Sequence, residues 1–187
     1  MAAVWRPRLG QWAAYAAILL VACSQASPGA TGPLVFVAYA SDFDGFRSWP
    51  AIAITADVAP GDDHLNGPRH VFLNERPPVG AKQFPVGTII VKETDPGPLT
   101  ERSVFAMVKR GGDYDPTGAL NWEWFQLLNA ADGAETIVWR GPGPSGGGAY
   151  GAGPLGGCNA CHGIAETTDY VLTPQLEQMV GGSGTEF

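Results

Sequence analysis

Five short segments rich in β-branched and aromatic residues constrain the fold of this chain more than any other feature. Each has the length of a β-strand, and only turn-like stretches separate one from the next. Strands connected in this way pair antiparallel, because a parallel pair needs a long crossover connection. The segments are His70–Asn74, Gly87–Glu93, Ser103–Arg110, Asn121–Leu128 and Glu135–Arg140. We therefore predict an α+β fold in which an antiparallel β-sheet of about five strands packs with short helices.

Two further segments have the pattern of short helices. Asp42–Trp49 stands directly before Pro50, a residue that cannot continue a helix. Pro174–Val180 begins with a proline and carries apolar residues at helical spacing. We expect both to pack on the sheet.

Alternation along the strands predicts which side chains share a face of the sheet. Trp122 and Trp124 fall on one face, and Glu123 falls on the other. By the same rule Ile90 and Lys92 share a face. A lysine in line with a core residue therefore points toward whatever covers that face.

The beginning of the chain has the pattern of a targeting segment. Two arginines stand close to the start, and Trp12–Ala22 follows as an apolar run of 11 residues. That run is shorter than the ~20 residues that a membrane-spanning helix needs. We predict that residues 1–22 are a signal peptide and that the protein is exported.

The signal peptide ends in Leu-Val-Ala-Cys, which resembles a bacterial lipobox with Cys23 as the lipid-carrying residue. A polar stretch follows, so we predict a tether over residues 23–33 and one folded domain over 34–187. The protein would then be anchored by lipid to a bacterial membrane and face the periplasm. The alternative is an ordinary signal peptide with an incidental cysteine.

Composition fits a globular domain and gives no sign of a nucleic-acid partner. Hydrophobic residues make up 45% of the chain, which suffices for a core. The net charge is −7, and no basic stripe is present that would neutralise phosphates. We expect no binding to nucleic acid.

Near the C-terminus the spacing C-x-x-C-H occurs at Cys158, Cys161 and His162. In an exported protein this spacing is typical of covalent haem attachment, with two thioether bonds and an axial histidine. We predict one haem c, with His162 as the iron ligand. Two alternatives are a thioredoxin-like redox disulfide, which needs a βαβ context, and a zinc site, which needs a fourth ligand.

The glycine-rich stretch before this motif, residues 141–157, is predicted to be a flexible loop. It lacks the Lys-Ser/Thr ending of a phosphate-binding loop.

No residue stands out as a second axial ligand for the iron. Met107 and Met179 fit core positions, while His64 lies in a predicted loop and His70 begins a predicted strand. An iron with a vacant position would bind small molecules such as nitric oxide or hydroxylamine. A plain electron-transfer cytochrome with Met179 or Met107 as sixth ligand is the alternative.

Four segments in order resemble the bacterial cytochrome P-460 family, which includes the cytochrome c′-beta proteins. They are FRSWP (46–50), GPRHVFLN (67–74), FPVGTIIVKE (84–93) and CNACHGIAETTDYVLT (158–173), and MVKRGGDYDPTGALNWEWF lies between the last two. The resemblance covers about residues 35–180. It implies an antiparallel sheet packed against helices, a homodimer, and one haem c with an open distal side.

The resemblance also implies roles for three further residues. Lys92 matches the lysine that cytochrome P-460 bonds to the porphyrin edge, whereas c′-beta relatives lack this cross-link. Arg69 matches a position that lines the haem pocket. Phe105 stands where cytochrome P-460 has a carboxylate, and a phenylalanine makes the distal side apolar, as in c′-beta proteins. Glu93 or Glu101 would replace that carboxylate only if the strand register slipped.

Two functional hypotheses follow from the resemblance. The first is oxidation of hydroxylamine, with or without nitric oxide, to nitrogen oxides, with electrons passing to a partner cytochrome. The second is a nitric oxide sensor, scavenger or carrier with little turnover.

Overall fold

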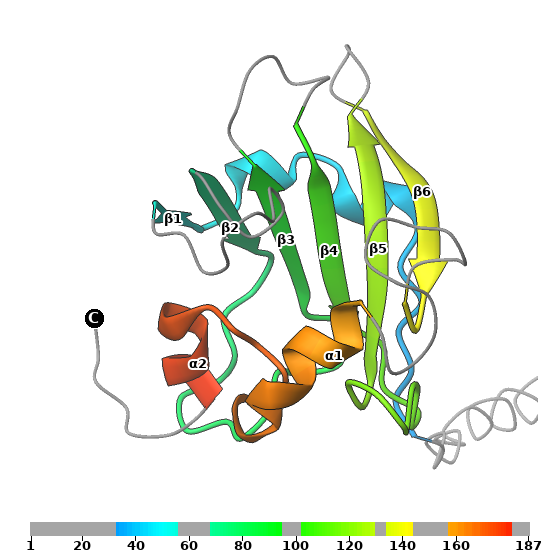
Figure 1. Ribbon diagram of the computed structural model, residues 1–187, viewed down its shortest axis with the longest axis vertical. Helices are drawn as coiled ribbons and strands as arrows, with labels where there is room; N and C mark the ends of the chain where they lie inside the picture. The colour runs from blue at the N-terminus through cyan, green and yellow to red at the C-terminus, as the bar shows by residue number, and fades with distance from the viewer. Residues whose placement is uncertain (1–32, 56–67, 95–101, 130–133, 144–156, 181–187) are drawn as a thin grey trace, which may run out of the picture. The chain divides into compact units, whose positions relative to one another are not determined.

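An antiparallel β-sheet of six strands, in the order β1-β2-β3-β4-β5-β6, forms the centre of the structure (Figure 1). The computed structural model describes residues 33–55, 68–94, 102–129, 134–143 and 157–180. The strands are β1 (Ala51–Ile54), β2 (Arg69–Leu73), β3 (Ile89–Thr94), β4 (Val104–Lys109), β5 (Trp122–Asn129) and β6 (Glu135–Gly141). Each strand pairs with the next along the chain, so the sheet is a simple meander.

The predicted α+β class with an antiparallel sheet is confirmed, and all five predicted strands are present with bounds shifted by one or two residues. The predicted number of strands is one too low. The additional strand, β1, has the sequence AIAI and lies at the edge of the sheet, paired only with β2. Four residues, half of them alanine, carry too weak a strand signal to be recognised from sequence.

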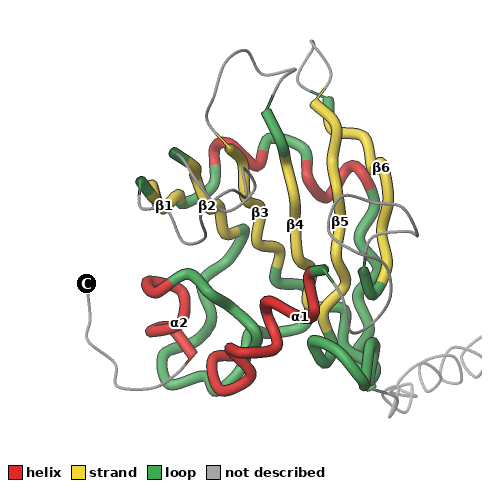
Figure 2. Tube along the Cα trace, in the orientation of Figure 1, coloured by secondary structure: helices red, strands yellow, loops and turns green. Residues whose placement is uncertain are grey.

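Short helices flank the sheet (Figure 2). They are η1 (Ala40–Phe43), η2 (Phe46–Ser48), α1 (Cys158–His162), η4 (Gly163–Thr168) and α2 (Pro174–Val180). The predicted helix over Asp42–Trp49 is instead two separate 3-10 turns, because Asp44 leaves the helical region and Gly45 adopts φ 67°. The predicted helix Pro174–Val180 is confirmed as α2.

Each face of the sheet carries its own apolar core. The first core joins Phe43 and Phe46, from η1 and η2, to strand residues such as Val91 and Phe125. The second core lies on the opposite face and joins the C-terminal segment to the sheet. Its buried members are Val71, Leu73, Phe84, Ile90, Met107, Ala119, Trp122, Trp124, Val171, Leu176 and Val180. Helix α2 supplies Leu176 and Val180 to this core, and in Figure 1 α1 crosses in front of the lower ends of β4 and β5.

The predicted alternation is confirmed in β3 and β5. Ile90 belongs to the second core while Val91 belongs to the first. Trp122 and Trp124 face the second core, and Glu123 is 2% exposed and bound to two arginines.

Several predictions lie outside the described residues. These are the signal peptide, Cys23, His64, Glu101 and most of the glycine-rich loop. Within the part of the chain that the structure describes, no helix is long and apolar enough to cross a bilayer.

Candidate functional site

The C-x-x-C-H motif forms helix α1, which lies against the second face of the sheet. Cys158 packs against the second core, and the His162 ring lies 4.6 Å from the Trp124 ring on β5. Both cysteines are free thiols and half-buried. The motif therefore brings two thiols and an imidazole together on one short helix beside the sheet.

Asn159, between the two cysteines, fixes this helix in place. Its Oδ1 accepts hydrogen bonds from the Ala119 backbone N–H and the Trp124 Nε1–H, both at 3.0 Å. Its Nδ2 donates to Asp115 Oδ2 and to the Pro142 carbonyl, both at 2.8 Å. All the hydrogen-bonding capacity of this buried amide is used, so α1 has one defined position over β5.

The His162 imidazole has a defined tautomer. Its Nδ1 lies 2.6 Å from the backbone carbonyl oxygen of Tyr170. A carbonyl can only accept, so Nδ1 carries the hydrogen and Nε2 keeps its lone pair. Histidines that bind metals are oriented by such a bond from the other ring nitrogen.

The Tyr170 carbonyl is held by an anchored turn. Asp169 and Tyr170 both adopt left-handed backbone conformations, with φ of 56° and 65°. The Asp169 carboxylate accepts from the Phe84 N–H at 2.8 Å and pairs with Lys109 Nζ at 2.5 Å, and its backbone carbonyl accepts from Trp122 Nε1 at 2.9 Å. Asp169 and Lys109 form a buried ion pair, with side chains 0% and 3% exposed. This pair is one of the contacts that hold an otherwise unfavourable turn.

Burial keeps the His162 imidazole and the Cys158 thiol neutral. The pKa of His162 is lowered to about 4, chiefly by desolvation and to a smaller extent by the Lys92 charge. The hydrogen bond to Tyr170 acts in the opposite direction and raises the pKa. Desolvation raises the pKa of the Cys158 thiol to about 11, against a smaller lowering by Lys92. At neutral pH His162 therefore has an unprotonated nitrogen available, and Cys158 is a thiol rather than a reactive thiolate.

Lys92 and Phe105 lie side by side in the row of residues next to the motif. Register pairs Val71 with Lys92, Lys92 with Phe105, and Phe105 with Gln126. Alternation from Ile90 and Met107 places Lys92 and Phe105 on the face that α1 covers, where both are half-buried. This alternation puts the Lys92 ammonium on the side of the sheet where Cys158 and His162 lie, and its charge lowers the pKa of both groups.

Arg69 lies on β2, opposite Thr94 on β3, and is 5% exposed. It stands two residues before Val71, so it faces the same side of the sheet as Lys92. Its role toward a haem stays a prediction.

Glu93 lies on the opposite face, against the first core. Its carboxylate is bound by Arg47 at 2.5 Å and by Arg102 at 3.1 Å, and it is 1% exposed. It therefore does not replace the carboxylate that is absent at Phe105. His70 shares this opposite face with Phe72, and their rings lie 6.0 Å apart.

Met107 and Met179 both pack in the second core, Met107 at 5% exposure and Met179 as a partly buried neighbour. This placement fits the core role that the sequence predicted for each methionine.

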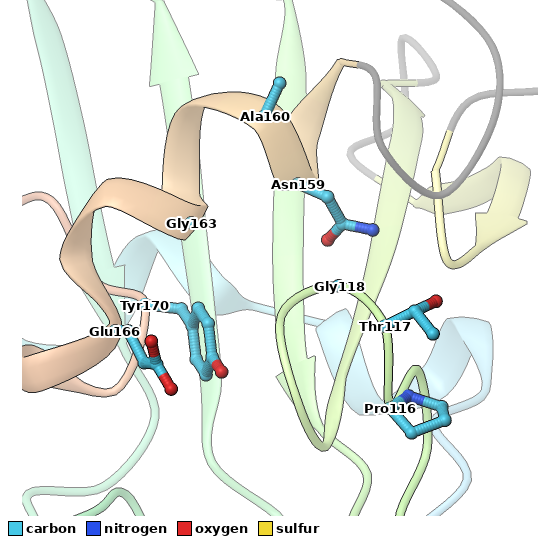
Figure 3. A pocket seen from close by; sticks show the side chains of 8 residues that line it. All are labelled: Pro116, Thr117, Gly118, Asn159, Ala160, Gly163, Glu166 and Tyr170. Carbon is cyan, nitrogen blue, oxygen red and sulfur yellow. The ribbon is translucent and has the colours of Figure 1, made fainter.

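A cleft of about 370 Å³ lies between α1 and the loop of Pro116, Thr117 and Gly118 (Figure 3). Its walls are Thr117 and its neighbours on one side and Glu166 and Tyr170 on the other, with Asn159 and Ala160 above them in the view. The lining residues do not include the two cysteines or His162. The cleft thus borders the motif only through Asn159 and Ala160.

The two alternative chemistries for the motif lack their structural context. A thioredoxin-like site needs a βαβ unit, and the described sheet is antiparallel throughout. A zinc ion needs three or four protein ligands, and the described residues contain no group of three or more His, Cys, Asp and Glu that could hold a metal ion.

Sequence reasoning found the motif but missed Asn159, Asp169, Lys109 and Gln126. The only sequence signal for Asn159 is its position inside the motif. Comparison with models of known protein families, with curated proteins and with solved structures found no match to this chain.

Proposed function

We propose that this chain is a haem c protein of the cytochrome P-460 type, attached through Cys158 and Cys161, with His162 as the axial ligand. One observation carries the proposal: the His162 Nδ1–H bond to the Tyr170 carbonyl leaves Nε2 free, on the same helix as two free thiols. This combination is what covalent haem attachment requires.

The donor set fits haem better than a bare metal ion. Haem iron needs a single neutral imidazole from the protein, and burial keeps His162 neutral. When bound, the haem supplies a redox-active iron that coordinates small nitrogen-containing molecules. The row of residues beside the motif then shapes the space that such molecules enter.

Three side chains from the sheet have roles in this proposal. Lys92 contacts the porphyrin edge or is bonded to it. Phe105, its cross-strand neighbour, gives the pocket an apolar wall. Arg69 is a cation that would bind a haem propionate or a ligand oxygen, since guanidinium groups bind such oxygens strongly.

The first candidate activity is oxidation of hydroxylamine, with or without nitric oxide, to nitrogen oxides. Oxidation of hydroxylamine to nitric oxide removes protons and electrons in equal number. Electrons would leave to a partner cytochrome, and protons to a base that touches the substrate.

A specific observation favours the second candidate, binding of nitric oxide with little turnover. The row that contains Lys92 and Phe105 continues to Gln126 and Trp139, and it holds no carboxylate. Without a base beside the ligand, proton removal from hydroxylamine is slow. We propose that the wild-type protein binds nitric oxide readily and turns hydroxylamine over slowly.

The test is expression of the full chain with a cytochrome c maturation system. We expect a mass increase of one haem that survives denaturation, and its loss in the variant carrying Cys158→Ala and Cys161→Ala. Haem that is also bonded to the peptide containing Lys92 would show the cross-link. Lys92→Ala would then abolish that bond and leave the attachment through the two cysteines. No covalent haem in the wild-type protein would contradict the proposal.

Turnover separates the two activities. Phe105→Glu places a carboxylate beside Lys92, so we expect hydroxylamine oxidation to rise by about tenfold or more, because general bases contribute 10²–10⁴-fold when ideally placed. Phe105→Gln, with similar size and no basic group, is the control. Equal rates in the two variants would show that Phe105 does not occupy the base position.

The cellular setting is proposed on sequence alone. We propose a homodimer that faces the periplasm, carries lipid on Cys23 and passes electrons to a partner cytochrome.

A further inference from the structure

Gln126 occupies a position that the proposed function leaves unassigned. It lies on β5, two residues after Trp124, whose ring contacts His162 at 4.6 Å. Register pairs it with Phe105 on one side and with Trp139 on the other. On the face of β5 that α1 covers, Gln126 is therefore the polar residue nearest to Trp124, in the row that holds Lys92.

The orientation of the Gln126 amide is determined by its neighbour. Trp139 Nε1 lies 2.6 Å from Gln126 Oε1. An indole N–H can only donate, so the amide oxygen must face Trp139 and the NH₂ group must face away from it. The bond removes the rotational freedom that an unpaired glutamine side chain keeps.

The Gln126 NH₂ group has two hydrogens to donate. In the described part of the chain no acceptor is bonded to it, and the side chain is half-buried rather than enclosed. Beside it stand the apolar ring of Phe105 and the indole of Trp139, neither of which offers an oxygen acceptor. Donors held in this way are suited to a ligand that carries an oxygen atom.

We propose that Gln126 donates a hydrogen bond to the oxygen of a small nitrogen–oxygen ligand, and that Trp139 holds its amide in the donating orientation. The inference rests on the proposed function, because it needs the ligand to bind on this face of the sheet. It assigns to Gln126 a preference for nitric oxide over carbon monoxide, because the oxygen of bound carbon monoxide is the weaker hydrogen-bond acceptor.

The experiment compares nitric oxide binding in the reduced wild-type protein and in Gln126→Leu. Loss of one hydrogen bond should speed dissociation of nitric oxide by about three- to tenfold. The N–O stretching frequency of the bound ligand should rise, because the donor no longer draws electron density toward its oxygen. Dissociation of carbon monoxide should change by a smaller factor.

Two further variants make the test specific. Gln178→Leu makes the same substitution at an exposed position of α2, and it should leave both the rate and the frequency unchanged. Trp139→Phe keeps the Gln126 amide but frees it to rotate. It should therefore raise the nitric oxide dissociation rate and the N–O stretching frequency, each by less than Gln126→Leu does. Trp139→Phe also tests the proposal if Gln126→Leu does not fold.

The outcomes distinguish failure of the proposed function from failure of the Gln126 assignment. A wild-type protein that acquires no covalent haem, or that binds no nitric oxide, overturns the proposed function and this inference with it. Wild-type binding with equal rates and frequencies in Gln126→Leu and Gln178→Leu overturns the inference alone.

Discussion

The buried pair between Lys109 and Asp169 provides the sharpest test of how the motif is supported. We consider Asp169→Asn. Asparagine tolerates the left-handed conformation at this position, φ 56°, and its amide oxygen can still accept from the Phe84 N–H. The substitution therefore removes the negative charge and leaves the rest of the turn intact.

The expected loss of stability follows from what remains around Lys109. The Lys109 side chain is 3% exposed, and among the described residues its ammonium keeps the Leu120 carbonyl at 3.4 Å and the face of the Trp122 ring at 4.9 Å. Removing one partner of a buried ion pair destabilises a protein by about 3–5 kcal/mol. Because the two remaining contacts partly stabilise the ammonium, we expect a loss of unfolding free energy near the lower end of this range, about 3 kcal/mol.

The assay is equilibrium unfolding of the full chain in urea. With a slope of about 2 kcal/mol/M for a domain of this size, the midpoint should fall by about 1.5 M. Asp113→Asn is the matched control, because Asp113 has nearly the same φ, 57°, and is exposed. It should change stability by less than about 0.5 kcal/mol.

A double-mutant cycle with Lys109→Met isolates the pair itself. If the cost of Asp169→Asn comes from an unpaired ammonium, the double variant should be more stable than Asp169→Asn alone, with a coupling of about 2 kcal/mol or more. A loss below about 1 kcal/mol in Asp169→Asn, or additive effects in the cycle, would refute this reasoning.

Two other side chains give testable effects. Asn159→Ala removes four hydrogen bonds at once, three of them buried. It should lower the free energy of unfolding, measured in urea, by about 2–4 kcal/mol. A loss under about 1 kcal/mol would mean that α1 does not depend on this amide. Burial raises the pKa of Glu135 above its ordinary 4.5, with Arg47 opposing the rise, so the folded protein keeps this proton to higher pH than the unfolded chain. The stability contributed by Glu135 is thus fully present below pH 4.5 and is lost as pH rises through the folded pKa. Glu135→Gln should remove that part of the pH dependence, and an unchanged profile of stability against pH would contradict the assignment.

The strands could be predicted from sequence because local patterns determine them. Alternation in GTIIVKE and NWEWFQLL reflects the two faces of a sheet directly, and so it placed Lys92 and Trp124 correctly. The edge strand Ala51–Ile54 was missed, because its pairing with β2 rather than its own composition makes it a strand. The helix predicted over Asp42–Trp49 was wrong because a left-handed glycine at position 45 divides it.

The C-x-x-C-H motif could be recognised from its spacing, but the contacts that support it could not. Asp169 is 60 positions from Lys109 and 85 from Phe84 along the chain, and only the folded meander brings the three together. The bond between Trp139 and Gln126 likewise depends on the register of β5 and β6, which shifts at a bulge after Gln126. No local pattern signals such contacts.

The direct test of the central claim is the absorption spectrum of the haem-loaded full chain, recorded oxidised and reduced. An iron bound by His162 on one side and open on the other gives high-spin, five-coordinate spectra that change when nitric oxide is added. That is the result we predict. Low-spin spectra in both oxidation states, with no change on adding nitric oxide, would mean that a second protein ligand fills the open position and would contradict the account.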